Sequence, residues 1–159
     1  MTHAYRLCKE KWKANSGTGA ALHGGRWNPV GVEVIYTSSS AALSILERIV
    51  HFTAGDLPDD DVVTEIHIPD AVKIDYVSAD QLPANWDALF DSPEAQAFGG
   101  QWVAERRSCV LSVPSSILES APSSVVRTER NLVINPAHLD FGLIEFFPSK
   151  PFAFDLRLK

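Results

Sequence analysis

Arg26, Tyr36 and Glu47 each carry a side chain that could bind a ligand or take part in catalysis, and they lie within the stretch HGGRWNPVGVEVIYTSSSAALSILERIVHF of residues 23–52. The arginine follows two glycines, which let the backbone approach a ligand closely. A guanidinium beside such a loop suits bidentate binding of a phosphate. The tyrosine ring offers a stacking surface for a planar ligand. Glu47 would be a carboxylate at the floor of a pocket.

Glu47 interrupts an otherwise apolar helix that we expect over residues 41–53. Residues three and four apart share a face of a helix, so Glu47 falls within an apolar stripe. The apolar residues of this stripe and of the adjoining one cover most of the circumference: Leu43, Leu46, Val50, Ile45, Ile49 and Phe52. We therefore expect a central helix, with Glu47 paired, hydrogen-bonded or facing a cleft, since burial of an isolated carboxylate is costly.

Each of the three residues also has a purely structural interpretation. Glu47 at the margin of the helix would reach solvent or pair with a surface cation. Arg26 would pair with a structural acid, Glu47 included. Tyr36 would be a core aromatic residue with its hydroxyl group at the rim, which is the commoner situation for a tyrosine. Pattern alone leaves these alternatives open.

The elements that must position these residues follow from turn signals and periodicity. Residues 15–31 are rich in glycine and are expected to form a loop. Ser38, Ser39 and Ser40 are candidates for the N-cap of the helix that follows. Two more helices are expected over residues 83–90 and 92–107. Strands are expected over residues 4–8, 32–37, 62–68, 72–77, 109–113, 131–136 and 143–147, with residues 152–158 closing the chain.

The expected strands outnumber the helices and do not alternate with them as in a βαβ series. The fold class is therefore α+β, with mostly antiparallel pairing. A length of 159 residues without a long linker predicts a single domain over residues 1–159.

Composition excludes several classes of function. The net charge of −6 argues against a protein that mainly holds a nucleic-acid backbone, although a small phosphorylated ligand needs only one or two local cations. No apolar run is long enough to span a membrane, and the N-terminus lacks a secretory signal. Cys8 and Cys109 lie far apart and outside a CxxC motif, which indicates the reducing cytoplasm.

Metal and other catalytic motifs are missing from the sequence. The histidines are scattered, at positions 3, 23, 51, 67 and 138, without HxxxH or HExxH spacing, so no metal site is expected. Asp59, Asp60 and Asp61 follow a proline and are expected to form a solvated turn. The sequence also lacks the GxSxG motif of a serine hydrolase and the P-loop.

Several motifs occur in a fixed order along the chain: GGRWNPVG, VIYTSSSAALSILERIVH, AFGGQWVAERRSCVLSVPSSIL, ERNLVINPAHLDF and FAFDLRL. In this order they resemble the RES domain family of bacterial toxins, from Tyr5 to Arg157. Each motif alone is a weak signal, whereas the ordered set is a strong one.

By this resemblance, active-site residues of the family can be matched to positions in this chain. Arg26 and Glu47 match the arginine and glutamate for which the family is named, and Ser115 is the best match for the serine, with Ser116 as the alternative. The further matches are Tyr36, Arg6 and Asn131.

The fold that the resemblance implies is similar to that of ADP-ribosyltransferase toxins, with two small packed sheets, a central helix and a cleft for NAD. The implied activity is cleavage of the nicotinamide–ribose bond by hydrolysis or phosphorolysis, which depletes cellular NAD and arrests growth, with NAD as substrate and no metal. Transfer of ADP-ribose to a protein is the alternative, and a non-catalytic binding module is a third reading. The intact site residues weigh against that module.

Residue roles follow from this implied chemistry. Glu47 would stabilise the cation that forms on the ribose, and Tyr36 would stack on nicotinamide. Arg26 would bind the pyrophosphate, and Arg6 would add a second contact to phosphate or ribose. Ser115 would hydrogen-bond the ribose or shape the cleft beside Glu47. Asn131 is a further candidate for binding NAD.

Partners also follow from the resemblance. It implies a cognate antitoxin with a helix-turn-helix domain of the Xre type. The acidic net charge and the lack of a long apolar run predict no direct contact of this chain with nucleic acid or membrane. The aromatic and apolar residues near the C-terminus are candidates for a homodimer interface.

Overall fold

The computed structural model describes residues 1–53, 55–90, 92–155 and 157–158. Eight strands form the sheet: β1 (Thr2–Lys9), β2 (Ile35–Ser38), β3 (Asp61–Ile68), β4 (Ile74–Tyr76), β5 (Val110–Pro114), β6 (Arg130–Ile134), β7 (Glu145–Phe146) and β8 (Lys150–Pro151). The α-helices are α1 (Thr18–His23), α2 (Ala41–Ile49), α3 (Pro93–Glu105) and α4 (Ser123–Thr128). Short 3-10 helices are η1 (Ala79–Gln81), η2 (Ser116–Leu118) and η3 (Leu139–Leu143).

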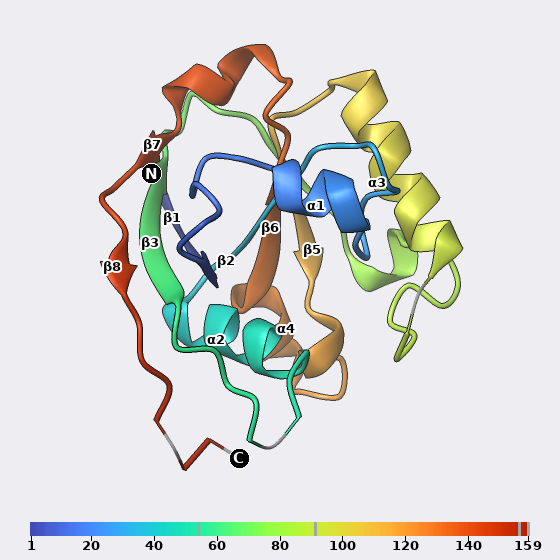
Figure 1. Ribbon diagram of the computed structural model, residues 1–159. Helices are drawn as coiled ribbons and strands as arrows, with labels where there is room; N and C mark the ends of the chain where they lie inside the picture. The colour runs from blue at the N-terminus through green and yellow to red at the C-terminus, as the bar shows by residue number, and fades with distance from the viewer. Residues whose placement is uncertain (54, 91, 156, 159) are drawn as a thin grey trace.

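The sheet has the strand order β4-β5-β6-β2-β1-β3-β7, and β8 also pairs with β3. Every described pairing is antiparallel except that of β4 with β5, which confirms the expected α+β class. The expectation of two small packed sheets is wrong, because the strands form one continuously hydrogen-bonded sheet. The junction is nevertheless narrow: β1 and β2 share one registered pair, Tyr5 with Ser38, and the sheet curls there (Figure 1).

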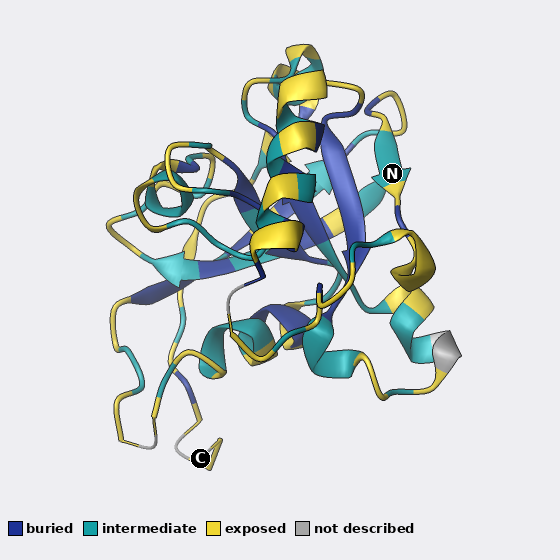
Figure 2. Cartoon of the chain, turned by 90° about the vertical axis from the view of Figure 1, so that its right-hand side faces the viewer, coloured by how far each residue is buried: buried dark blue, intermediate teal, exposed yellow. Residues whose placement is uncertain are grey.

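Apolar side chains pack on both faces of the sheet, because neighbouring residues of a strand point to opposite sides. One cluster joins the inner strands to η3 and β7: Ala4, Ile35, Ile66, Ile68, Val72, Cys109, Val110, Leu132, Ile134 and Ile144. The other lies against α3 and the loop before β2: Trp27, Val34, Val77, Trp86, Ala95, Trp102, Leu111, Val113 and Val133. Figure 2 shows α3 lying across the sheet with exposed residues on its outer side.

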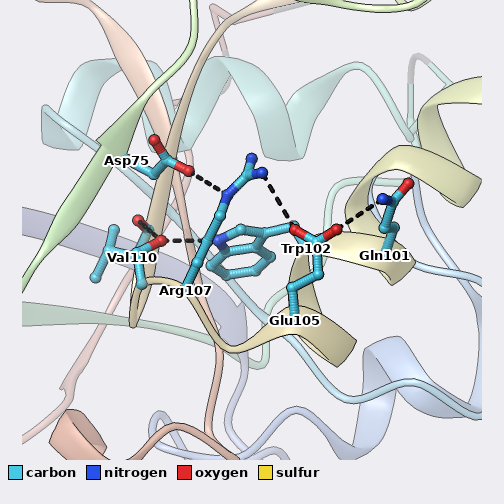
Figure 3. Close-up of polar contacts among 7 residues, drawn as sticks. Asp75, Gln101, Trp102, Glu105, Arg107 and Val110 are labelled. Atoms are coloured by element: carbon cyan, nitrogen blue, oxygen red, sulfur yellow. Dashed lines mark hydrogen bonds and ion pairs between the residues drawn. The ribbon is translucent and has the colours of Figure 1, made fainter.

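Helix α3 is fixed at both ends. Ser92 accepts a hydrogen bond from the backbone N–H of Ala95, and Pro93 occupies the first turn, as the sequence predicts. At the other end the buried indole of Trp102 donates to the Ser108 hydroxyl over 2.8 Å. Arg107 binds Asp75 of β4 over 2.7 Å, which ties the end of the helix to the edge of the sheet (Figure 3).

Gly99 of α3 is expected to tolerate no side chain. A Cβ atom there would lie 1.9 Å from the backbone oxygen of Trp27, so any side chain would push the helix away from the loop that carries Arg26. We expect Gly99→Ala to lower the free energy of unfolding by about 1–3 kcal/mol or more, measured by urea denaturation. Gly142→Ala is the control, because a Cβ atom at Gly142 meets nothing within 4 Å; equal stability of the two variants would contradict this packing.

Several predicted boundaries were wrong. The loop predicted over residues 15–31 contains α1, and the strand predicted from residue 32 begins at Ile35. Residues 83–90 form turns instead of a helix, because the chain reverses there to bring Trp86 onto Trp27. Helix α4 was not predicted. Residues 152–155 are not in a strand, and Leu156 of the closing segment lies outside the described residues.

Among the described residues, the helices are too short and too polar to cross a lipid bilayer.

Candidate functional site

Helix α2 carries Glu47 along the surface of the sheet instead of through the core. Its N-cap is Ser40, which accepts from the backbone N–H of Leu43 over 3.1 Å. Leu43 and Ser44 are buried, but Leu46 and Val50 are 42% and 57% exposed. The prediction of a central helix with a broad buried stripe was therefore wrong, and the face that α2 buries is narrow.

An ion pair orients α2 toward β3. Arg48 donates to both carboxylate oxygens of Asp61, over 2.7 and 2.8 Å, and the Asp61 side chain is fully buried. Because Arg48 adjoins Glu47 in the helix, this pair sets the rotation that aims Glu47 at the sheet. The prediction that Asp61 belongs to a solvated turn was wrong, because Asp61 opens β3 next to the helix.

Glu47 is held by two neutral donors. Ser115, which is buried at the end of β5, donates its hydroxyl hydrogen to Oε1 of Glu47 over 2.6 Å. The side-chain amide of Asn131 on β6 donates to the same oxygen over 2.5 Å. Ser38 on β2 donates in turn to Oδ1 of Asn131 over 3.0 Å. Glu47 is thus half-buried and hydrogen-bonded, as one of the sequence interpretations required.

Tyr36 links the glycine loop to the sheet. Its hydroxyl group donates to Oδ1 of Asn28 over 2.7 Å and accepts from the backbone N–H of Trp27 over 2.9 Å. Burial raises the pKa of Tyr36 well above its ordinary value, so the phenol stays protonated and remains a donor at neutral pH. A Cβ atom at Gly25 would lie 2.5 Å from the phenol oxygen, which explains a glycine at this position.

Both candidate arginines are held by backbone carbonyl groups. Arg26 donates to the carbonyl oxygens of Trp86 and Ala88 over 2.6 and 2.8 Å. Arg6 donates to those of Ala14 and Ser16 over 2.7 and 2.8 Å, and burial lowers the pKa of its guanidinium. Neither arrangement is the pairing with Glu47 that was one sequence alternative for Arg26.

Most of the candidate residues lie along one face of the sheet. Tyr36 and Ser38 are two residues apart on β2 and therefore share a face, about 6.6–6.8 Å apart along the strand. Asn131 is the cross-strand partner of Ser38 and brings Glu47 and Ser115 to the same side. Arg26 adjoins Trp27, which binds the Tyr36 hydroxyl group.

Arg6 is separated from this group. Its neighbour Tyr5 is the cross-strand partner of Ser38, so Arg6 points to the opposite face of β1. The structure therefore brings together Glu47, Ser115 and Asn131 by direct contact, places Tyr36 and Arg26 further along the same face, and leaves Arg6 on the other side.

Two open hollows lie elsewhere, along β4. One of about 280 Å³ is lined by residues that include Lys73 and Tyr76, and one of about 420 Å³ reaches Phe98 and Arg107. The predicted site residues line neither of them. Arg107 and Asp75 in the larger hollow already bind one another, which indicates a structural role (Figure 3).

Two residues of the site were missed by sequence reasoning. Asn28 connects Tyr36 with the loop through its amide group, which also donates to the carbonyl oxygens of Ala20 and Val32 over 2.9 Å each. In the sequence, the RWNP motif that contains Asn28 could have pointed to this residue. Ser38 was considered only as a helix cap, and its contact with Asn131 depends on strand register.

Comparison with known proteins gives consistent matches. The family model described as "RES domain" matches residues 3–155. A protein of Sphingobium sp. (strain YBL2), named "Prs ADP-ribosylating toxin", is 39% identical over 90% of this chain and 85% of its own length. A "Toxin Res" of Photorhabdus laumondii is 37% identical over 86% of this chain and 83% of its own.

A solved structure shares the fold. The crystal structure of the M. tuberculosis MbcT–MbcA toxin–antitoxin complex contains a chain with a TM-score of 0.74 and 20% identity. The match covers 95% of this chain and 84% of that one. At this identity the likeness establishes the fold alone.

Proposed function

This chain belongs to the RES domain family, and from that premise we propose that it is the toxin of a toxin–antitoxin pair that cleaves NAD between nicotinamide and ribose. The observation that carries the proposal is the fixed carboxylate of Glu47, held by Ser115 and Asn131 on the same face as Tyr36. The names of the toxin relatives support it.

Cleavage of the nicotinamide–ribose bond needs no strong general acid. Nicotinamide leaves the pyridinium as a neutral molecule, while the ribose passes through a state that resembles an oxocarbenium ion, as in glycoside hydrolysis. A fixed negative charge beside the anomeric carbon stabilises that cation. Glu47 fills this role, because its partners are neutral donors that orient the carboxylate without cancelling its charge.

The two carboxylate oxygens of Glu47 are assigned different partners. Both contacts with described residues engage Oε1, so we assign Oε2 to the ribose hydroxyl groups of NAD. Ser115 and Asn131 then act as positioning residues, since they reach NAD through Glu47. This assignment requires the ribose to bind beside the start of β6, where Asn131 lies, in a cleft of the kind proposed for an ADP-ribosyltransferase-like fold.

The remaining contacts to NAD follow from position along the same face. Tyr36 would adjoin the nicotinamide ring, and Arg26 would bind the pyrophosphate. Two phosphate oxygens would then replace the carbonyl oxygens of Trp86 and Ala88 on its guanidinium. Arg6 is the weakest of these assignments, because its guanidinium points away from Ser38 and onto the loop before α1.

Transfer of ADP-ribose to a protein is the second candidate, favoured by the name of the Sphingobium relative. Purified protein incubated with NAD alone distinguishes the two reactions. Rapid release of free nicotinamide and ADP-ribose supports cleavage with water as the acceptor. Little release from NAD alone, together with label on a second protein, supports transfer. No loss of NAD in either assay contradicts both proposals.

Ser115 and Ser116 are distinguished by a pair of single substitutions. Ser115→Ala removes a hydrogen bond to the charged Glu47, so nicotinamide release is expected to fall about tenfold to a hundredfold. Ser116 opens η2, and Ser116→Ala is expected to retain the parent rate. Steady-state assays on both variants, with unfolding curves to show equal folding, test this expectation. A larger loss for Ser116→Ala would contradict it.

The proposed partner is an antitoxin that covers this site. The M. tuberculosis relative in fold was solved as a toxin–antitoxin complex, which supports a partner of this kind. A helix-turn-helix antitoxin of the Xre type and a homodimer of the toxin are parts of the same proposal. Both cysteines, Cys8 and Cys109, are free thiols, which is compatible with action in the reducing cytoplasm.

A further inference from the structure

Two histidines and a glutamate meet at the other end of the sheet, on β1 and β3. Nδ1 of His3 lies 3.2 Å from Oε1 of Glu65, and Nε2 of His67 lies 3.0 Å from the same oxygen. The three ligand atoms all lie within 4.8 Å of one another. His3 and Glu65 are 62 residues apart, so no sequence spacing reveals the group.

Strand register assembles this cluster. His3 and His67 are direct cross-strand partners, and Glu65 precedes His67 by two residues on the same face of β3. Backbone pairing along the whole of β1 therefore holds the three side chains side by side. The expectation that no metal site exists was based on spacing within single elements, which cannot detect a site built across two strands.

The donors suit zinc in type and spacing. Two imidazole nitrogens and one carboxylate oxygen form a common set for Zn²⁺, with a fourth position filled by water. Bonds of about 2.0 Å in tetrahedral geometry place ligand atoms about 3.3 Å apart, close to the two distances observed. We propose that His3, Glu65 and His67 bind a zinc ion that clamps β1 to β3.

Packing around the cluster restricts the rings as a metal site requires. The ring of Phe147 lies 4.3 Å from that of His67, and the His3 ring stands edge-on to His67 at 4.4 Å. The Phe147 backbone N–H also donates to the Glu65 carbonyl oxygen over 3.0 Å. His67 is thus the best-fixed ligand, while His3 and Glu65 are more exposed and leave the fourth position open to solvent.

The competing explanation is a network of hydrogen bonds without metal. In that case the imidazoles hydrogen-bond the carboxylate, and contacts with His67 and then His3 lower the pKa of Glu65. Such a network is not stabilised by zinc. The two explanations therefore differ in what zinc does to the protein, independently of any reaction with NAD.

Untagged full-length protein, freed of metal with a chelator, tests the proposal by titration calorimetry with zinc chloride. We expect one zinc ion per chain, a higher melting temperature with zinc, and visible absorption bands of a tetrahedral site when Co²⁺ is used instead. Mg²⁺ is expected to have no effect, because it prefers oxygen ligands in an octahedral arrangement.

The variants His67→Ala and Glu65→Gln are expected to weaken zinc binding at least 10- to 100-fold, the loss caused by removing even a group that supports a ligand. His51→Ala is the control, since His51 is exposed and follows α2, which packs at the start of β3, whereas His67 lies near the end of that strand. Zinc binding that is absent from the parent protein, or equal in the parent and in His67→Ala, would overturn the proposal. Circular dichroism of each metal-free variant establishes that it is folded.

Discussion

Glu47→Gln is expected to lower the rate of nicotinamide release from NAD by about 10²–10³, the loss typical of removing one preorganised charge-stabilising group. Glutamine keeps the shape of the side chain, and its carbonyl oxygen still accepts from Ser115 and Asn131. Only the negative charge opposite the developing cation is lost. The measurement is steady-state release of nicotinamide by purified protein.

Two comparisons make this result specific to the charge. Glu119→Gln neutralises an exposed carboxylate just beyond η2, and it is expected to leave the rate unchanged. The Glu47→Gln protein is expected to unfold at the same urea concentration as the parent. A variant that stays folded and releases nicotinamide at the parent rate would exclude Glu47 from the reaction.

Asp61→Ala is expected to reduce the free energy of unfolding by about 3–5 kcal/mol, the usual cost of breaking a buried ion pair on one side. The Asp61 side chain is fully buried and binds the Arg48 guanidinium with both oxygens. Its removal leaves the Arg48 charge without its acceptor and releases the contact that orients α2. Chemical denaturation measures the loss.

Asp60 provides the matched control for this prediction. It precedes Asp61, and its half-exposed carboxylate lies 3.5 Å from Lys9. An exposed pair of this kind contributes about 0–1 kcal/mol, so Asp60→Ala is expected to change stability little. If the two variants had equal stability, the ion pair would not be what anchors α2.

The Asp61→Ala protein is also expected to release nicotinamide more slowly, because α2 carries Glu47.

Local signals predicted a large part of the fold. Ser40 and Ser92 cap α2 and α3 where the sequence placed helix starts, since a cap depends on neighbouring residues alone. Strands β3, β5 and β6 were recognised from periodicity. Helices α1 and α4 were not, because each spans only six residues and lacks a clear apolar stripe.

Burial could not be read from periodicity at α2. An apolar stripe through Leu46 and Val50 predicted a central helix, but both side chains are exposed, because the helix lies against the junction of β1 and β2. The sheet curls at that junction, so the surface available to cover the helix is small. Curling depends on strand pairing, which a sequence pattern does not specify.

Contacts between distant segments account for the rest of the site. Resemblance to the family indicated Glu47, Ser115 and Asn131, yet only the folded structure shows that Ser115 and Asn131 both donate to Glu47. Asp61 and His67 illustrate the same limit. The acidic run at residues 59–61 was expected to be solvated, and the spacing of the histidines gave no sign of partners. Packing of α2 gives Asp61 its partner Arg48, and pairing of β1 with β3 brings His67 beside Glu65 and His3.

The central claim is that this chain consumes NAD through the carboxylate of Glu47. The most direct measurement is the NAD content of cells after induced expression of the parent chain and of Glu47→Gln at matched protein levels. We predict that NAD falls and growth stops with the parent chain, and that both stay normal with the variant. Unchanged NAD in cells arrested by the parent chain, or equal loss of NAD with the variant, would contradict the claim.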